Sequence, residues 1–173
     1  MPTRIGPYTI VRCIGGGGQG QVFLGHDTRL QRQVAIKIHR LPGAREARRD
    51  TLREARRLAG IRDPRVVQVH DVVESSDYLA LVMEYVPGED LGEILEKHSP
   101  LPWQKALHIA RQVALALGHA HELDIVHRDI KPENILLRWL HALVTDFGVA
   151  KAVSEATGRE QLTTAGVALG TPD

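Results

Sequence analysis

The 173-residue chain has a single cysteine, almost no net charge and no long apolar run. One cysteine, Cys13, cannot form a disulfide within the chain, which fits a reducing compartment. The 22 basic and 21 acidic residues leave a net charge of +1, which argues against a dedicated nucleic-acid or membrane-surface binder. The first residues lack the apolar region of a secretion signal, and no run is long enough to span a bilayer. We therefore expect a cytoplasmic protein, or the cytoplasmic part of a longer membrane-anchored one.

A cluster of chemistry-bearing residues occurs in the C-terminal half. It reads His-Arg-Asp-x-Lys-x-x-Asn, and an Asp-Phe-Gly triplet follows downstream. Phosphoryl transfer needs a base near the acceptor hydroxyl, positive charge near the moving phosphate, and metal ligands. Asp129 is the candidate base and Lys131 can reach the phosphate, whereas oxygens of Asn134 and Asp146 suit Mg2+. Either motif alone could be an ordinary turn, but both together at this spacing indicate a phosphotransferase.

A glycine-rich stretch lies near the N-terminus. Residues 15–22 fit G-x-G-x-x-G-x-V, in which glycines let the backbone approach phosphates closely. Alone, the pattern also fits a flexible turn or a dinucleotide-binding loop. A dinucleotide-binding loop opens a helix, but the strand-like run 21–24 follows here. We therefore predict a phosphate-binding hairpin with the contact residues Ile14, Gly15, Gly16, Gly17, Gly18, Gln19, Gly20 and Val22.

The next strand-like run, 33–38, contains Val-Ala-Ile-Lys. Side chains alternate between the two faces of a strand, so Ala35 and Lys37 share one face. This places a small residue beside a nucleotide base and an ammonium beside its phosphates. A surface lysine on an edge strand is the plainer alternative, and the preceding glycine-rich loop favours the phosphate contact.

Periodicity and composition predict the other elements. Five strand-like runs are expected at 8–14, 21–24, 33–38, 66–73 and 78–85, with helices at 44–61, 91–98 and 102–123. The arginines of the first helix are expected to form mostly a solvated face. The helix 102–123 is apolar on most sides, so we expect it to be buried on most sides. Short strands flank the segment Arg138-Trp139-Leu140-His141, which is unusually apolar for a turn.

Taken in order, these motifs resemble those of the eukaryotic-like serine/threonine protein kinases, in the style of the bacterial branch. The lysine two residues after Asp129 is the form found in serine/threonine rather than tyrosine kinases. The resemblance implies an α+β fold, with a five-stranded antiparallel small lobe and one helix over 1–86. The first part of a mainly helical large lobe follows over 87–173. The resemblance stops before the family's Ala-Pro-Glu-like motif and the further helices that follow it, which implies a kinase domain truncated in its activation segment. In the family those helices cover the helix 102–123, so we expect a large apolar face of it to stay uncovered here. This piece alone is therefore expected to be poorly soluble and inactive.

The resemblance also implies roles for residues around the predicted hinge. Met83 matches the gatekeeper, and the backbones of Glu84 and Val86 would bond the adenine edge. Asp90 or Glu89 would hold the ribose. Leu136, together with Val22 and Ala35, would sandwich the adenine.

A helix glutamate pairs with the strand lysine in the family, and Glu54 is its best match here. Glu46 is the second choice, because it lies too near the helix start. His127 is expected to be a structural residue packing near Phe147 rather than a metal ligand.

The segment after Asp146 matches the activation segment. Arg128 would answer a phosphate on it through charge-assisted hydrogen bonds. Thr163 and Thr164 are the preferred candidate phosphorylation sites, and Thr157 is a less favoured candidate. Thr171 matches the threonine that contacts the catalytic Asp and Lys.

Three functions remain to be weighed. The first is an ATP- and Mg2+-dependent kinase acting on serine or threonine hydroxyls of protein substrates. The second is a non-catalytic nucleotide-binding or interaction fragment. The third, a small-molecule phosphotransferase, is disfavoured because the long threonine-bearing segment points to protein substrates. The oligomeric state and the substrate are not encoded in any motif.

Overall fold

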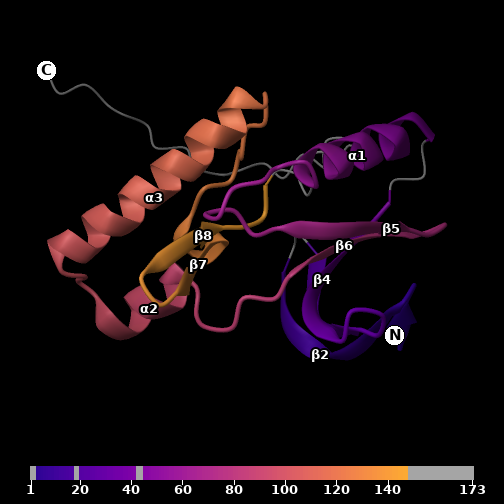
Figure 1. Ribbon diagram of the computed structural model, residues 1–173, viewed down its shortest axis with the longest axis horizontal. Helices are drawn as coiled ribbons and strands as arrows, with labels where there is room; N and C mark the ends of the chain where they lie inside the picture. The colour runs from indigo at the N-terminus through magenta and orange to yellow at the C-terminus, as the bar shows by residue number, and fades with distance from the viewer. Residues whose placement is uncertain (1–2, 18–19, 42–44, 148–173) are drawn as a thin grey trace, which may run out of the picture.

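The computed structural model describes residues 3–17, 20–41 and 45–147 (Figure 1). Within these ranges, the N-terminal half is an antiparallel sheet with one helix, and the C-terminal half contains two helices and a small two-stranded sheet. The mixed architecture confirms the expected α+β class. No helix of the described part is long and apolar enough to cross a membrane.

The described part of the N-terminal sheet has six strands rather than the expected five, in the order β1-β2-β3-β4-β6-β5. The additional strand is β1 (Arg4–Ile5), which pairs Ile5 with Tyr8. Two residues are too few to show an alternating pattern, so this strand left no periodic signal. The other strands are β2 (Tyr8–Gly17), β3 (Gly20–Asp27), β4 (Arg32–Arg40), β5 (Val69–Glu74) and β6 (Tyr78–Glu84).

Alternation along β4 separates the two faces of the sheet. Val34 and Ile36 are fully buried in a cluster on one face. Ala35, on the other face, belongs to the larger core cluster, which also contains residues of the helices and of the C-terminal half. Lys37 shares the face of Ala35, as predicted. Continuity of this second core across both halves fixes their relative position.

Helix α1 (Arg45–Leu58) crosses near the sheet and buries Ala55 and Leu58. Most of its arginines are exposed, as expected for a solvated face. Arg48 differs, because it donates hydrogen bonds to the carboxylate of Glu74 at 3.1 Å and to the carbonyls of the following turn. These bonds attach α1 to the end of β5.

The C-terminal half begins with α2 (Leu91–His98). Its N-terminus is closed by a capping box, in which the Asp90 carboxylate accepts from the Glu93 N–H and the Glu93 carboxylate accepts from the Asp90 N–H. The elements that follow are α3 (Trp103–Glu122), the 3-10 turn η1 (Pro132–Asn134), β7 (Ile135–Arg138) and β8 (His141–Val144).

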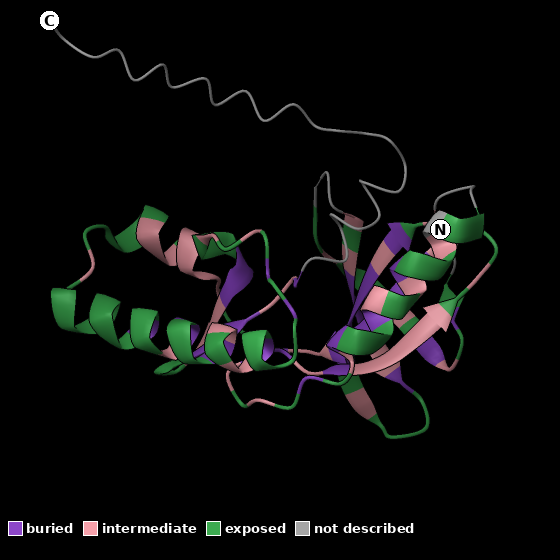
Figure 2. Cartoon of the chain, turned by 90° about the horizontal axis from the view of Figure 1, so that it is seen from above, coloured by how far each residue is buried: buried purple, intermediate pink, exposed green. Residues whose placement is uncertain are grey.

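Helix α3 is buried along one side only, which agrees with the expectation that a large apolar face of this helix stays uncovered without the family's later helices. Its buried residues, Ile109, Val113, Ala116 and Ala120, lie along one face only. Most of the remaining residues of α3 are exposed (Figure 2), and Leu107 is 62% exposed. Among the described elements, β8 makes the main contacts with α3. The apolar pattern shows which residues of the helix are apolar, but it does not show how many other elements cover them.

Within the described residues, two backbone links between the halves stand out. One is the segment 85–90 between β6 and α2. The other runs before β5, where the Val67 N–H donates to the Val144 carbonyl at 2.9 Å and the Val144 N–H donates to the Arg65 carbonyl at 2.8 Å. These backbone bonds attach β8 to the N-terminal half and bring Asp146 and Phe147, which follow β8, close to the sheet.

Candidate active site

A cleft of about 580 Å³ lies between the N-terminal sheet and the segment that carries the two polar motifs. Its volume lies within the range of small-ligand sites. Fifteen of the predicted site residues line it: Ile14, Gly15, Gly16, Gly20, Val22, Ala35, Lys37, Met83, Glu84, Val86, Asp90, Lys131, Asn134, Leu136 and Asp146. Residues from five separate stretches of sequence therefore meet in one place.

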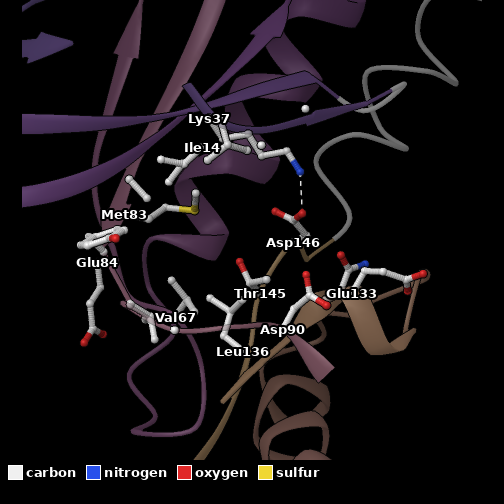
Figure 3. A pocket seen from close by; sticks show the side chains of 18 of the residues that line it. Ile14, Lys37, Val67, Met83, Glu84, Asp90, Glu133, Leu136, Thr145 and Asp146 are labelled. Atoms are coloured by element: carbon white, nitrogen blue, oxygen red, sulfur yellow. Dashed lines mark ion pairs between the residues drawn. The ribbon is translucent and has the colours of Figure 1, made fainter. Parts of the chain in front are cut away.

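The cleft has an apolar part. Val22 and Ala35 come from β3 and β4, whereas Leu136 comes from β7 in the other half. Met83 lies at the back, and Figure 3 shows it on the sheet side of the cleft. A flat apolar group can fit between these walls.

The hairpin that covers the cleft requires glycine at one described position. Gly20 has a φ of +123°, and an added Cβ would lie 2.6 Å from the Ile38 carbonyl oxygen. Only glycine adopts this conformation at such close approach. Gly17 is the last residue of β2, and Gly18 and Gln19 lie outside the described residues.

Lys37 and Asp146 form an ion pair inside the cleft (Figure 3). The ammonium nitrogen lies 2.7 Å from Asp146 Oδ2, and the two side chains are 6% and 21% exposed. The expected Lys37–Glu54 pair is absent from the structure. Glu54 instead lies 3.7 Å from Arg57, one turn along α1. Glu54 and Lys37 therefore each have another partner of opposite charge, Arg57 and Asp146 respectively.

Arg57 also attaches α1 to the end of α3. Its Nη2 donates to the Asp124 carbonyl at 3.0 Å. The arginine therefore links Glu54 to the segment that precedes the His-Arg-Asp motif. Glu46, the second choice, lies exposed in the first turn of α1.

Asp129, Lys131 and Asn134 form one hydrogen-bonded group. Asn134 Nδ2 donates to the Asp129 carbonyl at 2.8 Å and to Asp129 Oδ2 at 3.2 Å. The Lys131 ammonium lies 3.3 Å from the same carboxylate oxygen. Asp129 is not among the residues that line the cleft, but two of its partners are. Its carboxylate is thus held at the edge of the cleft beside a cation and an amide.

His127 is buried beside this group and packs near Phe147, as predicted. It is 2% exposed, and its ring lies 4.5 Å from that of Phe147. Its Nδ1 faces the Asp129 N–H at 3.3 Å, so Nδ1 must accept and Nε2 must carry the proton donated to the Thr145 carbonyl at 2.8 Å. Burial lowers the pKa of His127, against the opposing effects of the Thr145 carbonyl and the nearby aspartates. The neutral imidazole therefore joins the two motifs.

Both motifs contain a non-glycine residue with positive φ. Arg128 has φ of 67° and Asp146 has φ of 63°. Left-handed backbone at such residues is costly, by about 1–2 kcal/mol each, and occurs where surrounding contacts enforce it. Asp146 itself has the left-handed backbone, and Asp129 directly follows Arg128, which also has it. The strained backbone therefore sets the directions of the Asp129 and Asp146 side chains.

Several lining residues were not anticipated: Arg12, Val67, Tyr85, Gly88, Glu93, Glu133 and Thr145. Glu133 and Thr145 are direct neighbours of predicted ligands, and this adjacency was the available signal. Val67 lies in the connection between halves, and no local motif marks it. The predicted sites Thr163 and Thr164, as well as Thr157 and Thr171, lie outside the described residues.

Comparison with known proteins agrees with this geometry. A model of the protein kinase domain matches residues 8–171. The chain belongs to the protein kinase family. It is 44% identical over 155 residues to the serine/threonine-protein kinase PrkC of Bacillus subtilis. It is 38% identical over 172 residues to PknE of Mycobacterium bovis. These matches cover 88% and 98% of this chain, and confirm the resemblance to bacterial serine/threonine kinases.

The relatives are much longer than this kinase chain, which covers 24% of PrkC and 30% of PknE. Among solved structures, the kinase domain of Mycobacterium tuberculosis PknI matches with a TM-score of 0.77 at 32% identity, over 84% of this chain and 61% of that one. Rad53 residues 1–466 in complex with AMP-PNP match with a TM-score of 0.75 at 27% identity, over 83% and 38%. The kinase fold is therefore shown for most of the chain.

Proposed function

We propose that this chain carries the ATP-binding and phosphoryl-transfer residues of a serine/threonine protein kinase that acts on protein substrates. One observation carries the proposal: Lys37, Asn134 and Asp146 line the same cleft, and Asp129 is bonded at its edge. In this division, residues 1–86 form the small lobe and 87–173 belong to the large lobe. The Rad53 complex with AMP-PNP supports an adenine nucleotide as the ligand.

The adenine would lie in the apolar part of the cleft, between Ala35 and Leu136. The Glu84 N–H already donates to the Gln68 carbonyl at 2.8 Å. We therefore assign the adenine edge to the Glu84 carbonyl and the Val86 N–H. For the ribose we favour Asp90, which lines the cleft, over Glu89, which pairs with Lys97.

The donor set at the phosphate end fits Mg2+. Asn134 is 4% exposed and uses its Nδ2 for Asp129, which leaves the carbonyl oxygen of its amide as a metal ligand. Asp146 supplies carboxylate oxygens beside it in the cleft. These hard oxygen donors suit Mg2+, which when bound would neutralise charge on the nucleotide phosphates.

The remaining groups would act on the acceptor. The Asp129 carboxylate would accept the proton of a serine or threonine hydroxyl as the hydroxyl oxygen attacks the γ-phosphorus. The Lys131 ammonium, 3.3 Å from that carboxylate, would offset negative charge on the moving phosphoryl group. Lys37 would hold the nucleotide phosphates from above.

We propose that the structure represents a resting arrangement. Active protein kinases need the strand lysine paired with the helix glutamate. Here Lys37 is paired with Asp146, and Glu54 with Arg57. A movement of α1 that exchanges these partners would complete the site.

Transfer of labelled phosphate from ATP to a protein acceptor tests the proposal in the gene's full-length product. Asp129→Asn should abolish transfer. Asp124→Asn is a matched control, because Asp124 is exposed, lies five residues earlier and has the positive φ that asparagine tolerates. Undiminished transfer by Asp129→Asn would refute its role, and ATP binding without any transfer would favour the non-catalytic alternative. Peptide mapping of the active protein checks Thr163 and Thr164, and phosphate found only elsewhere would remove them.

A further inference from the structure

The segment 85–90 that joins the two halves is fixed at its far end by backbone contacts with β7. The Leu137 N–H donates to the Glu89 carbonyl at 3.1 Å, and Asp90 pairs with Leu136 in an antiparallel bridge. Residues on both sides of these bonds line the cleft. The far end of the segment is therefore part of the small sheet of the C-terminal half.

The near end of the same segment is fixed by a side-chain ion pair. Arg138, the last residue of β7, donates from Nη1 to Oε1 of Glu84 at 2.6 Å. Glu84 is the last residue of β6, in the other half of the molecule. The side chains are 39% and 31% exposed. The pair thus closes a ring formed by the end of β6, residues 85–90 and β7.

Arg138 is held by a well-anchored turn. The Gln112 side chain accepts from the Ala142 N–H at 3.2 Å and donates to the Leu140 carbonyl at 3.0 Å. His108 contacts the same carbonyl at 3.1 Å. The turn between β7 and β8 is therefore attached to two successive turns of α3. The backbone next to Arg138 is therefore held in place, and the guanidinium extends from it to Glu84.

The Glu84 carboxylate extends away from the Lys37–Asp146 pair (Figure 3). Glu84 nevertheless lines the cleft together with Val86, and its backbone N–H donates to the Gln68 carbonyl. The ion pair therefore acts on the cleft from outside, by fixing the backbone of the residue that begins the adenine edge.

We propose that Arg138 is a positioning residue for adenine recognition. This inference rests on the proposed function. Glu84 and Val86 can bond a base only if the segment between β6 and α2 is already in place. An ion pair that holds this segment in the free protein lowers the ordering cost of binding. The effect belongs to the base and not to the phosphates, because Arg138 does not line the cleft itself and bonds Glu84, at the end assigned to the adenine.

The test compares steady-state kinetics of the gene's full-length product with its Arg138→Gln variant. We expect the KM for ATP to rise by about threefold to fivefold, the upper part of the range for losing one partly exposed ion pair, with kcat changed by less than about twofold. Adenosine, used as a competitive inhibitor, should lose affinity by the same factor. Inorganic tripolyphosphate, which has no base, should keep its inhibition constant.

Arg48→Gln is the matched control. It removes a guanidinium of similar exposure from the Arg48–Glu74 pair, which is 3.0 Å long and distant from the cleft lining. We expect no change in the KM for ATP. In addition, Arg138→Gln should have no further effect in a Glu84→Gln background, because the pair is then already broken.

The outcomes separate this proposal from the proposed function. A full-length product that binds no ATP would overturn the function itself. A product that binds ATP while Arg138→Gln keeps its KM within about twofold, or loses affinity for tripolyphosphate as much as for adenosine, would overturn only the role of Arg138. A lower KM or a raised kcat in the variant would also overturn it, since the pair would then restrain the site instead of preparing it.

Discussion

Breaking the Lys37–Asp146 ion pair from either side should destabilise the protein by different amounts. At 2.7 Å, the two charges attract by about 6 kcal/mol at an effective dielectric constant of about 20. Most of this attraction is offset by the loss of hydration that burial imposes on both groups. The cost of a single substitution is therefore set by how well the remaining charge can be hydrated.

The exposures of the two side chains give the order. Asp146→Asn leaves the Lys37 ammonium, which is 6% exposed, and should lower the free energy of unfolding by about 3–5 kcal/mol. Lys37→Met leaves a carboxylate that is 21% exposed, and should cost about 1–3 kcal/mol. The double variant has no unpaired charge, so it should be more stable than Asp146→Asn alone.

Urea unfolding at neutral pH measures these free energies, and the double-mutant cycle gives the coupling between the two residues. The pair Arg48–Glu74 is the control, since its side chains are 30% and 37% exposed and its coupling should stay below about 1 kcal/mol. Equal losses from the two single variants, or losses that simply add, would refute the reasoning. Phosphoryl transfer should be lost in the double variant even where stability recovers.

Two further predictions concern stability. The pKa of Asp63 is lowered in the folded protein, first by the hydrogen bond from the Arg65 side chain. The Asp63 carboxylate should therefore stabilise the protein at pH values above 3.8, its pKa in the unfolded chain, and this stabilisation should be lost as the pH falls through the folded pKa. Asp63→Asn should therefore be less stable at pH 7, and urea titrations should show the difference closing in acid; a constant difference would contradict this. Gly25→Ala should lower stability by about 1–3 kcal/mol, because its Cβ would lie 2.5 Å from Ile36 Cδ1. Gly118→Ala, which meets nothing within 4 Å on exposed α3, should be neutral or stabilising, and equal melting temperatures for the two variants would exclude the steric explanation.

The sequence was most informative about site residues that belong to short contiguous motifs. The His-Arg-Asp segment and the Val-Ala-Ile-Lys strand predicted one shared cleft, and Lys37, Lys131 and Asn134 line it. Alternation along β4 correctly placed Ala35 and Lys37 on one face. These predictions depend on local spacing, which the backbone converts directly into position.

Contacts that depend on distant partners could not be read in the same way. The carboxylates of Asp146 and Glu54 are both candidate partners of Lys37. Which of them pairs with Lys37 depends on the position of α1, which the local motif does not specify. The Glu84–Arg138 pair joins residues 54 positions apart, without any periodic signal. The pattern of α3 shows which residues are apolar, but the number of neighbouring elements decides which of them are buried. β1 was missed because two residues cannot display a period.

The most direct test is a crystal structure of the gene's full-length product with a non-hydrolysable ATP analogue and Mg2+. We predict the base between Ala35 and Leu136, the phosphates beside Lys37, and the metal ion bound by Asn134 and Asp146. A nucleotide bound elsewhere, or a metal ion that contacts neither of these two side chains, would contradict the assignment of this cleft.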